Sequence, residues 1–350
     1  MNRPTGSRVV ARRLIVVVAL VAPLVAGELF IRGLIAARHL PVAAAHQAAL
    51  EVAWTNYQQN GPTDILIVGD SLARMGIHPA TLARLAEGDA GRPVTAYNLS
   101  TPGAGFPVYR AFLEELGREG RLPKVVVIGI STVGLQRGDR QSARALRSPL
   151  GRLVSDCQEV RVLEEVLSCR LESVSALWRW RGQMGRLAEA LRGSVPATRK
   201  DGGITVQVDG YARSLPMRPE TLDDQLAVAL ENTRRLANVQ LNLAAYSDLV
   251  HAAKSRGVRV VSVLIPYSPP LEAALEAREP GWRTLRSSML ERLGRRAGQP
   301  ILEGGSLEGW TIHDSHDTRH FSLPGAERFT AQLWEQPAFR SDIVDALRGS

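Results

Sequence analysis

Residues 64–79 run Asp64-Ile-Leu-Ile-Val-Gly-Asp-Ser-Leu-Ala-Arg-Met-Gly-Ile-His-Pro79. The apolar, β-branched run from Ile65 to Val68 predicts a short buried strand, and the glycine after it ends that strand. Pro79 and the Thr-Leu-Ala-Arg-Leu run that follows it favour the start of a helix. Ser71 therefore lies just past the carboxyl end of a strand, where open α/β sheets bind their ligands. This is a position in which a serine hydroxyl can act as a nucleophile.

A second motif lies near the other end of the chain, at Asp314-Ser-His-Asp317-Thr-Arg-His320-Phe-Ser-Leu-Pro-Gly325. It places an acid and a histidine three residues apart, and a Leu-Pro-Gly turn follows two residues later. The run from Ala326 towards Leu347 then predicts a helix. A Gly-Asp-Ser tripeptide is common by chance, so this second motif carries much of the functional interpretation.

Together, Gly69-Asp70-Ser71 and Asp317-x-x-His320 resemble the first and last blocks of the SGNH/GDSL hydrolase superfamily. The resemblance covers roughly residues 62–348. It implies a three-layer α/β/α, flavodoxin-like domain with the activity of a serine esterase or O-acyltransferase. Ser71 would be the nucleophile, His320 the general base, and Asp317 the group that orients the imidazole. Neither a metal nor a cofactor is expected.

The same resemblance suggests an oxyanion hole. The stretch from Asn98 to Gly103 is similar to the superfamily's second block, so the N–H of Gly103 is expected to join that of Ser71. The third block of the family has Gly-x-Asn, whereas this chain has Gly-Ile-Ser131. Ser131 is the expected substitute donor, although a hydroxyl has a shorter reach than an asparagine amide. Asp70 is expected to close the turn with its side chain.

Strands are predicted to begin near residues 65, 94, 125, 258 and 300, with helices between them. This alternation predicts a parallel five-stranded sheet covered on both faces. One long helix is expected over residues 221–256, another over 282–297, and a rigid loop over 266–270, which contains three prolines.

Between residue 134 and about residue 221 the alternation stops, which predicts a helical and hairpin insertion after the third strand. It contains the chain's two cysteines, Cys157 and Cys169. In an exported protein they are expected to form a disulfide worth about 3 kcal/mol, with two free buried thiols as the alternative. Trp178 and Trp180 are expected to pack against a helix, with stacking on a sugar ring as the alternative.

Residues 1–40 contain six arginines against Glu28 alone, a net charge of +5 out of +8 for the whole chain. Four of these arginines precede an apolar run from Leu14 to Ala26, and apolar character resumes as far as Ala37. This pattern predicts a signal-anchor or transmembrane segment with its positive end inside and the rest of the chain exported. A removed signal peptide, cleaved near residues 43–45, is the alternative. Residues 41–61 predict a helical stalk before the domain at 62–348.

The composition fits a globular domain, with 45% hydrophobic and 22% charged residues. The net charge beyond residue 40 is only +3. No Gly-rich phosphate loop and no interleaving of aromatic and basic residues is present, so nucleic-acid binding is not predicted.

Two alternative functions remain open on the sequence. Three histidines and two aspartates crowd into residues 313–320, which could form the site of a metal-dependent hydrolase, although no HExxH helix preorganises them. The missing asparagine leaves room for a catalytically degenerate, SGNH-like carbohydrate-binding or scaffold protein of an envelope acylation complex.

Membrane-anchored members of the superfamily assist the O-acylation of polysaccharides and teichoic acids. The resemblance therefore implies an acylated carbohydrate or lipid as substrate, for example the O-acetyl groups of cell-surface polysaccharide. It also implies a single-pass protein of the bacterial cell membrane, with its catalytic domain on the extracytoplasmic, periplasmic side. A multi-spanning membrane acyltransferase is the expected partner.

Overall fold

The computed structural model describes residues 19, 21–30, 53–54, 56–102, 105–132, 175, 205–206, 210–233, 236 and 243–349. The chain divides into two compact units, one formed by Met1–Ala44 with Pro149–Arg199 and the other by Ala45–Ser148 with Lys200–Ser350. Most of the described residues belong to the second unit, which holds both sequence motifs.

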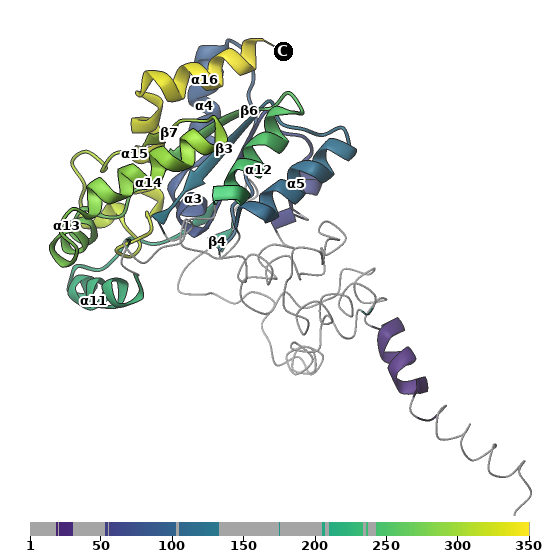
Figure 1. Ribbon diagram of the computed structural model, residues 1–350, viewed down its shortest axis with the longest axis horizontal. Coiled ribbons are helices and arrows are strands. Elements are labelled where there is room, and N and C mark those ends of the chain that lie inside the picture. The colour runs from purple at the N-terminus through teal and green to yellow at the C-terminus, as the bar shows by residue number, and fades with distance from the viewer. Residues whose placement is uncertain are drawn as a thin grey trace, which may run out of the picture. The chain divides into compact units, whose positions relative to one another are not determined.

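A five-stranded parallel sheet organises the second unit (Figure 1). Its strands lie in the order β2-β1-β3-β6-β7, and every neighbouring pair is parallel. In chain order this is 2-1-3-4-5, which is compatible with a flavodoxin-like fold. The predicted α/β class and five-stranded parallel sheet are confirmed. The strands are β1 (Ile65–Gly69), β2 (Ala96–Asn98), β3 (Val125–Ile130), β6 (Arg259–Leu264) and β7 (Ile301–Glu303).

Two groups of helices pack on this sheet. In one group α5 lies beside α12 and α12 beside α14, and in the other α4 lies beside α15 and α16. The chain steps from β1 to β2 in one direction and from β2 to β3 in the other, so right-handed crossovers place α4 and α5 on opposite faces. These helices are α4 (Pro79–Ala90), α5 (Phe106–Arg118), α12 (Leu243–Lys254), α14 (Trp282–Ala297), α15 (Leu323–Trp334) and α16 (Pro337–Arg348).

Shorter elements connect the sheet to the loops at its carboxyl edge. Strands β1 and β3 are buried along their whole length and lie in the middle of the sheet. The loops that follow them therefore lie at the centre of the carboxyl edge. The connecting elements are α3 (Ser71–Gly76), η3 (Pro219–Thr221), α11 (Leu222–Asn232), α13 (Pro269–Arg278) and η5 (Ile312–Asp314).

Two glycines in neighbouring strands allow α3 to lie directly on the carboxyl edge of the sheet. Gly69 ends β1 with a φ of 154° and is paired in register with Gly129 of β3. A Cβ atom at Gly69 would come within 2.5 Å of both Ala73 Cβ and Gly129 O, and one at Gly129 would overlap Ala73 Cβ. Any larger residue at either position would push α3, and Ser71 with it, away from the sheet.

The single long helix predicted over residues 221–256 is wrong. The structure has α11 and α12 instead, and α11 ends at Asn232 because Thr233 takes an extended conformation (φ −97°, ψ 114°). The Thr233 hydroxyl donates to Ala229 O at 2.7 Å. Such a bond to the backbone four residues earlier competes with regular helix geometry.

The helical run predicted from Ala326 to Leu347 is also interrupted, into α15 and α16. Pro337 has no N–H to donate and disfavours helical backbone in the residue before it, and Gln336 is accordingly extended (φ −75°, ψ 116°). The predicted rigid loop at 266–270 is shorter than expected, because α13 begins at Pro269. Proline is well suited to a first helical turn.

Part of the segment predicted as a stalk packs on the sheet domain. Trp54 is 4% exposed and Tyr57 is completely buried. The Trp54 ring stacks on Phe112 of α5, with ring centroids 4.8 Å apart. These residues therefore contribute to the core of the second unit.

The N-terminal segment is described only at residues 19 and 21–30, which are helical. No helix in the part of the chain that the structure describes is long and apolar enough to span a membrane, so the predicted transmembrane helix is not supported.

Most of the predicted insertion at 134–221 lies outside the described residues, and so do Cys157, Cys169, Trp178 and Trp180 with the predictions made for them. Its last part is described. There β4 (Thr205–Val206) and β5 (Ala212–Arg213) form an antiparallel pair, as the predicted hairpin requires.

The close approach of α3 to the sheet can be tested with Gly129→Ala. We expect the added methyl group to lower the free energy of unfolding by about 1–3 kcal/mol, because it overlaps Ala73. Gly88→Ala in α4 is the matched control, since no atom lies within 4 Å of a Cβ there. That substitution should raise the stability by about 0.5–1 kcal/mol. Urea denaturation measures both, and equal stabilities for the two variants would contradict the contact.

Candidate active site

Ser71 is held at the first position of α3, directly after β1. Asp70 is the N-cap of this helix, and its Oδ1 accepts the N–H of Leu72 at 3.0 Å. Asp70 thus closes the turn with its side chain, as predicted from the sequence. The Ser71 side chain is left half-buried at the carboxyl edge of the sheet, beside the end of β3.

The loop that carries Asp317 and His320 closes on itself. Its base is formed by a bridge between Ser315 and Phe321, and the N–H of His316 donates to His320 O at 2.8 Å. Inside the loop Asp317 Oδ1 accepts the backbone N–H of His320 at 2.8 Å. The three-residue spacing therefore brings the acid and the imidazole together within one tight turn.

Ser71, His320 and Asp317 lie in hydrogen-bonding order. His320 Nε2 is 2.9 Å from Ser71 Oγ, and His320 Nδ1 is 2.8 Å from Asp317 Oδ2. An ionised carboxylate can only accept, so Nδ1 carries the hydrogen that donates to Asp317. In the neutral imidazole Nε2 then accepts the hydroxyl hydrogen of Ser71, although 249 positions separate the two residues in the sequence.

The charges of this cluster are coupled. Burial disfavours the imidazolium, but the negative charge and hydrogen bond of Asp317 outweigh burial and raise the pKa of His320 above its ordinary value. Burial would also raise the pKa of Asp317, yet the charge of His320 and three hydrogen bonds hold it well below the usual range. Asp317 is therefore ionised at neutral pH and favours the protonated form of His320.

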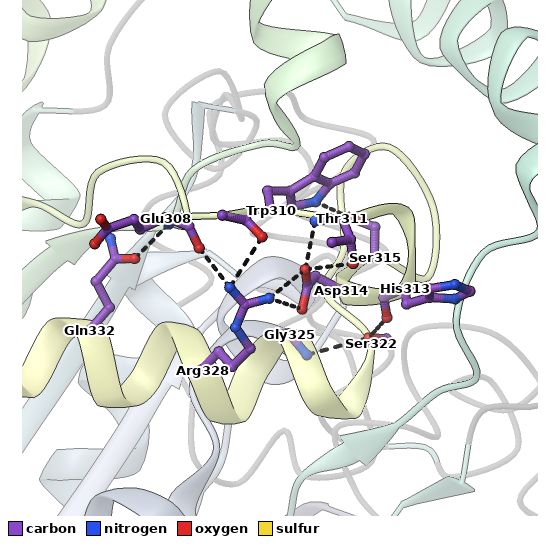
Figure 2. Close-up of polar contacts among 11 residues, drawn as sticks. Glu308, Trp310, Thr311, His313, Asp314, Ser315, Ser322, Gly325, Arg328 and Gln332 are labelled. Atoms are coloured by element: carbon purple, nitrogen blue, oxygen red, sulfur yellow. Dashed lines mark hydrogen bonds and ion pairs between the residues drawn. The ribbon is translucent and has the colours of Figure 1, made fainter.

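An ion pair between the exposed Arg328 and the buried Asp314, which precedes this loop in the sequence, supports the loop (Figure 2). Asp314 is 3% exposed, and Arg328 of α15 donates from one nitrogen to both of its oxygens, at 2.8 and 2.7 Å. Asp314 Oδ2 also accepts the N–H of Thr311 at 2.7 Å. The Ser322 hydroxyl donates to His313 O at 2.5 Å and caps α15. These contacts hold the residues just before Asp317 against α15.

The predicted oxyanion donors are only partly described. Gly103 lies outside the described residues. Ser131 is 1% exposed, and its hydroxyl donates to Asp70 Oδ2. A hydroxyl has one hydrogen to donate, so this arrangement does not support the role expected for Ser131 as an oxyanion donor. Its contact instead joins the end of β3 to the turn that carries the nucleophile.

The histidine and aspartate side chains of residues 313–320 do not form a metal-binding cluster. Among the described residues no group of three or more His, Cys, Asp or Glu side chains is placed to hold a metal ion. His316 Nδ1 faces Leu215 O at 3.0 Å, and Asp314 is engaged by Arg328. His313 is exposed.

Two residues of the site were missed by sequence reasoning. Arg319 donates to Ala229 O at 2.7 Å and to Thr233 Oγ1 at 2.9 Å, which connects the loop of Asp317 and His320 to the end of α11. Asn98 is completely buried, and its amide donates at 3.0 Å to the carbonyl groups of Ala73 and Ile77. A polar residue at the end of a predicted buried strand was a sequence signal that could have pointed to Asn98. The spacing of residues gave no such signal for Arg319.

The arrangement can move a proton from a serine hydroxyl to an imidazole whose second nitrogen is held by a carboxylate, which is what nucleophilic acyl transfer requires. No family model matches this chain, and no curated protein matches it. Function must therefore be inferred from the residues and their geometry.

The coupling between the two charges can be tested with Asp317→Asn. The substitution removes the charge that raises the pKa of His320, so an NMR titration should show a lower His320 pKa than in the parent protein. A pKa that is higher in the folded than in the unfolded protein contributes stability. This contribution is complete at pH values below the pKa of the unfolded protein, and it is lost as the pH rises through the pKa of the folded protein. Asp317→Asn should therefore cost more stability at about pH 5.5 than at about pH 9.

The control for this test is Asp342→Asn on α16, which makes the same charge change at the partner of Arg259. It should leave the His320 titration in place. An unchanged His320 pKa in Asp317→Asn would contradict the coupling.

Proposed function

We propose that this protein is a serine esterase or acyltransferase of the SGNH/GDSL kind, acting on ester-linked acyl groups. The observation that carries the proposal is the alignment of Ser71, His320 and Asp317, with 2.9 Å between Ser71 Oγ and His320 Nε2. A catalytically degenerate binding protein would have no need of this alignment, so it favours an enzyme. The 2-1-3-4-5 strand order, with Ser71 after the first strand, also suits the flavodoxin-like SGNH domain.

In the first half of the reaction His320 Nε2 takes the hydroxyl proton of Ser71 while Oγ attacks the ester carbonyl carbon. The tetrahedral intermediate collapses when the imidazolium gives this proton to the leaving alkoxide. An alcohol departs, and the acyl group stays on Ser71. Asp317 keeps the hydrogen on Nδ1 throughout and stabilises the imidazolium.

In the second half an incoming hydroxyl takes the place of the alcohol. His320 Nε2 removes the proton of this hydroxyl while its oxygen attacks the acyl carbonyl. When the intermediate collapses, the bond to Ser71 Oγ breaks and the imidazolium gives its proton to Oγ. Water as acceptor gives hydrolysis, and a sugar hydroxyl gives transfer. The same residues serve both outcomes.

The negative oxygen of each intermediate requires donors beside Ser71. We assign this role to the backbone N–H of Ser71 and, by the resemblance of its segment to the family's second block, to that of Gly103. The substrate class follows the same resemblance, namely acylated carbohydrate or lipid outside the cytoplasm, with a multi-spanning membrane acyltransferase as the partner in envelope O-acylation.

The proposal is tested by steady-state kinetics on 4-nitrophenyl acetate. Ser71→Ala and His320→Ala should each lower kcat by at least about a thousandfold, because members of a triad act as a unit. Asp317→Asn should lower kcat by up to about ten-thousandfold, because the imidazole loses its productive tautomer.

His316→Ala is the matched control, since its ring faces Leu215 O and not Ser71. It should leave kcat within about threefold of the parent, and turnover should survive a chelator. Turnover in Ser71→Ala equal to that of the parent would rule out the proposal. Equal losses at His313, His316 and His320 with chelator sensitivity would point to a metal-dependent hydrolase instead.

A further inference from the structure

Arg74 is a buried arginine without a partner among the described residues, and it lies one helical turn past the nucleophile. The residue is 7% exposed, and its Nε is buried with no hydrogen-bond partner. Within the described part of the chain, no hydrogen bond or ion pair engages its guanidinium group. The proposed reaction makes no use of this residue.

The chain treats a comparable arginine differently. Arg286 is 8% exposed, and it donates to the Glu272 carboxylate at 2.5 Å while its guanidinium lies 4.7 Å from the Trp282 ring centroid. The buried charge of Arg286 is therefore balanced within the protein. The lack of a counter-charge is particular to Arg74 in this comparison.

A buried charge without a counter-charge is costly. Burial lowers the pKa of the Arg74 guanidinium, and the groups that oppose this shift are the phenols of Tyr109 and Tyr97. Phenols are uncharged at neutral pH, whereas a guanidinium remains protonated. Among the described residues no negative charge is placed to balance that of Arg74, so a bound ligand can take this role.

The position of Arg74 relates it to the ester site. Ser71 and Arg74 are three residues apart on α3, so they share a helix face with Cβ atoms about 5–6 Å apart. A long helical side chain also leans towards the preceding turn, which here is the turn of Ser71. The Tyr109 hydroxyl, one of the groups acting on Arg74, donates to Gly69 O, two residues before the nucleophile.

Arg74 and His320 are influenced by different groups. The charges that act most strongly on His320 are those of Asp317, Asp70 and Arg319. The groups that act on the Arg74 guanidinium are instead the phenols of Tyr109 in α5 and Tyr97 in β2. Because it lies one turn after Ser71 on α3, Arg74 suits a substrate group several bonds from the reacting carbonyl better than the carbonyl oxygen itself.

We propose that Arg74 binds an anionic group, a carboxylate or phosphate, carried by the ester that Ser71 attacks. The inference rests on the proposed function and narrows its substrate class to negatively charged esters. A guanidinium can donate two parallel hydrogen bonds to such a group, and a dry environment strengthens that pair. The anionic group belongs either to the acyl part or to the alcohol part, and the two parts are tested separately.

The test compares charged esters with neutral isosteres. For the acyl part these are mono-4-nitrophenyl succinate and 4-nitrophenyl 4-methylpentanoate, and for the alcohol part 4-acetoxybenzoate and 4-acetoxybenzamide. The parent protein should prefer the charged ester of at least one pair. Arg74→Gln should then lower kcat/KM for that ester by about tenfold to a hundredfold, mainly through KM, and change the neutral isostere by less than about threefold. Arg74→Lys should retain part of the preference, because it keeps the charge but loses the bidentate geometry.

Arg84→Gln is the matched control, because it removes the same charge from an exposed position on α4. It should leave the preference intact. Melting temperatures separate binding from a structural role: Arg74→Gln should melt no lower than the parent, because it removes an unpaired buried charge. A parent protein without preference in either pair, or equal losses on charged and neutral esters in Arg74→Gln, would overturn the inference.

Binding without turnover separates this inference from the proposed function. The charged ester should raise the melting temperature of Ser71→Ala, and adding Arg74→Gln to that variant should abolish the rise. If binding depends on Arg74 but the protein hydrolyses no ester, the esterase proposal is refuted and the proposal of an anion site stands. Ester turnover with no effect of Arg74 on preference or binding would refute the anion site and leave the esterase.

Discussion

The contact of Ala73 with Gly69 and Gly129 sets the position of everything at the carboxyl edge of the sheet. Because neither strand has a side chain there, α3 can lie across β1 and β3 and start directly at the end of β1. Asp70 then reaches both the N–H of Leu72 and the hydroxyl of Ser131. The nucleophile is thus fixed by backbone packing against the most buried strands, before any contact with His320 is made.

Much of this framework could be predicted because it follows from local patterns. The β-branched runs at residues 65–68 and 125–128 predicted strands that the structure confirms, and the three-residue spacing of Asp317 and His320 is realised in one turn. The predictions that failed depend on individual side-chain hydrogen bonds. The end of α11 needs the backbone contact of Thr233, and the hydroxyl of Ser131 is directed by Asp70, which lies 61 positions away. Neither contact can be predicted from the spacing of residues in the sequence.

Charged groups of the domain differ in whether they have a partner of opposite charge. Asp314 is matched by Arg328, and Glu272 by Arg286, and both pairs fasten loops or helices to the fold. Asp317 is matched by His320, but that pair also contacts Ser71 and so connects stability to chemistry. Arg74 has no such match among the described residues, which is why its charge is assigned to recognition of a ligand and not to the architecture.

The proposed chemistry requires that His320 activate Ser71 for attack on a carbonyl or an equivalent electrophile. Mass spectrometry after treatment with a fluorophosphonate tests it directly, because the reagent needs an activated serine and no knowledge of the natural substrate. We expect a single adduct on the peptide that contains Ser71, absent in Ser71→Ala and formed far more slowly in His320→Ala. An adduct that forms at the same rate in His320→Ala, or the lack of any adduct at Ser71, would contradict it.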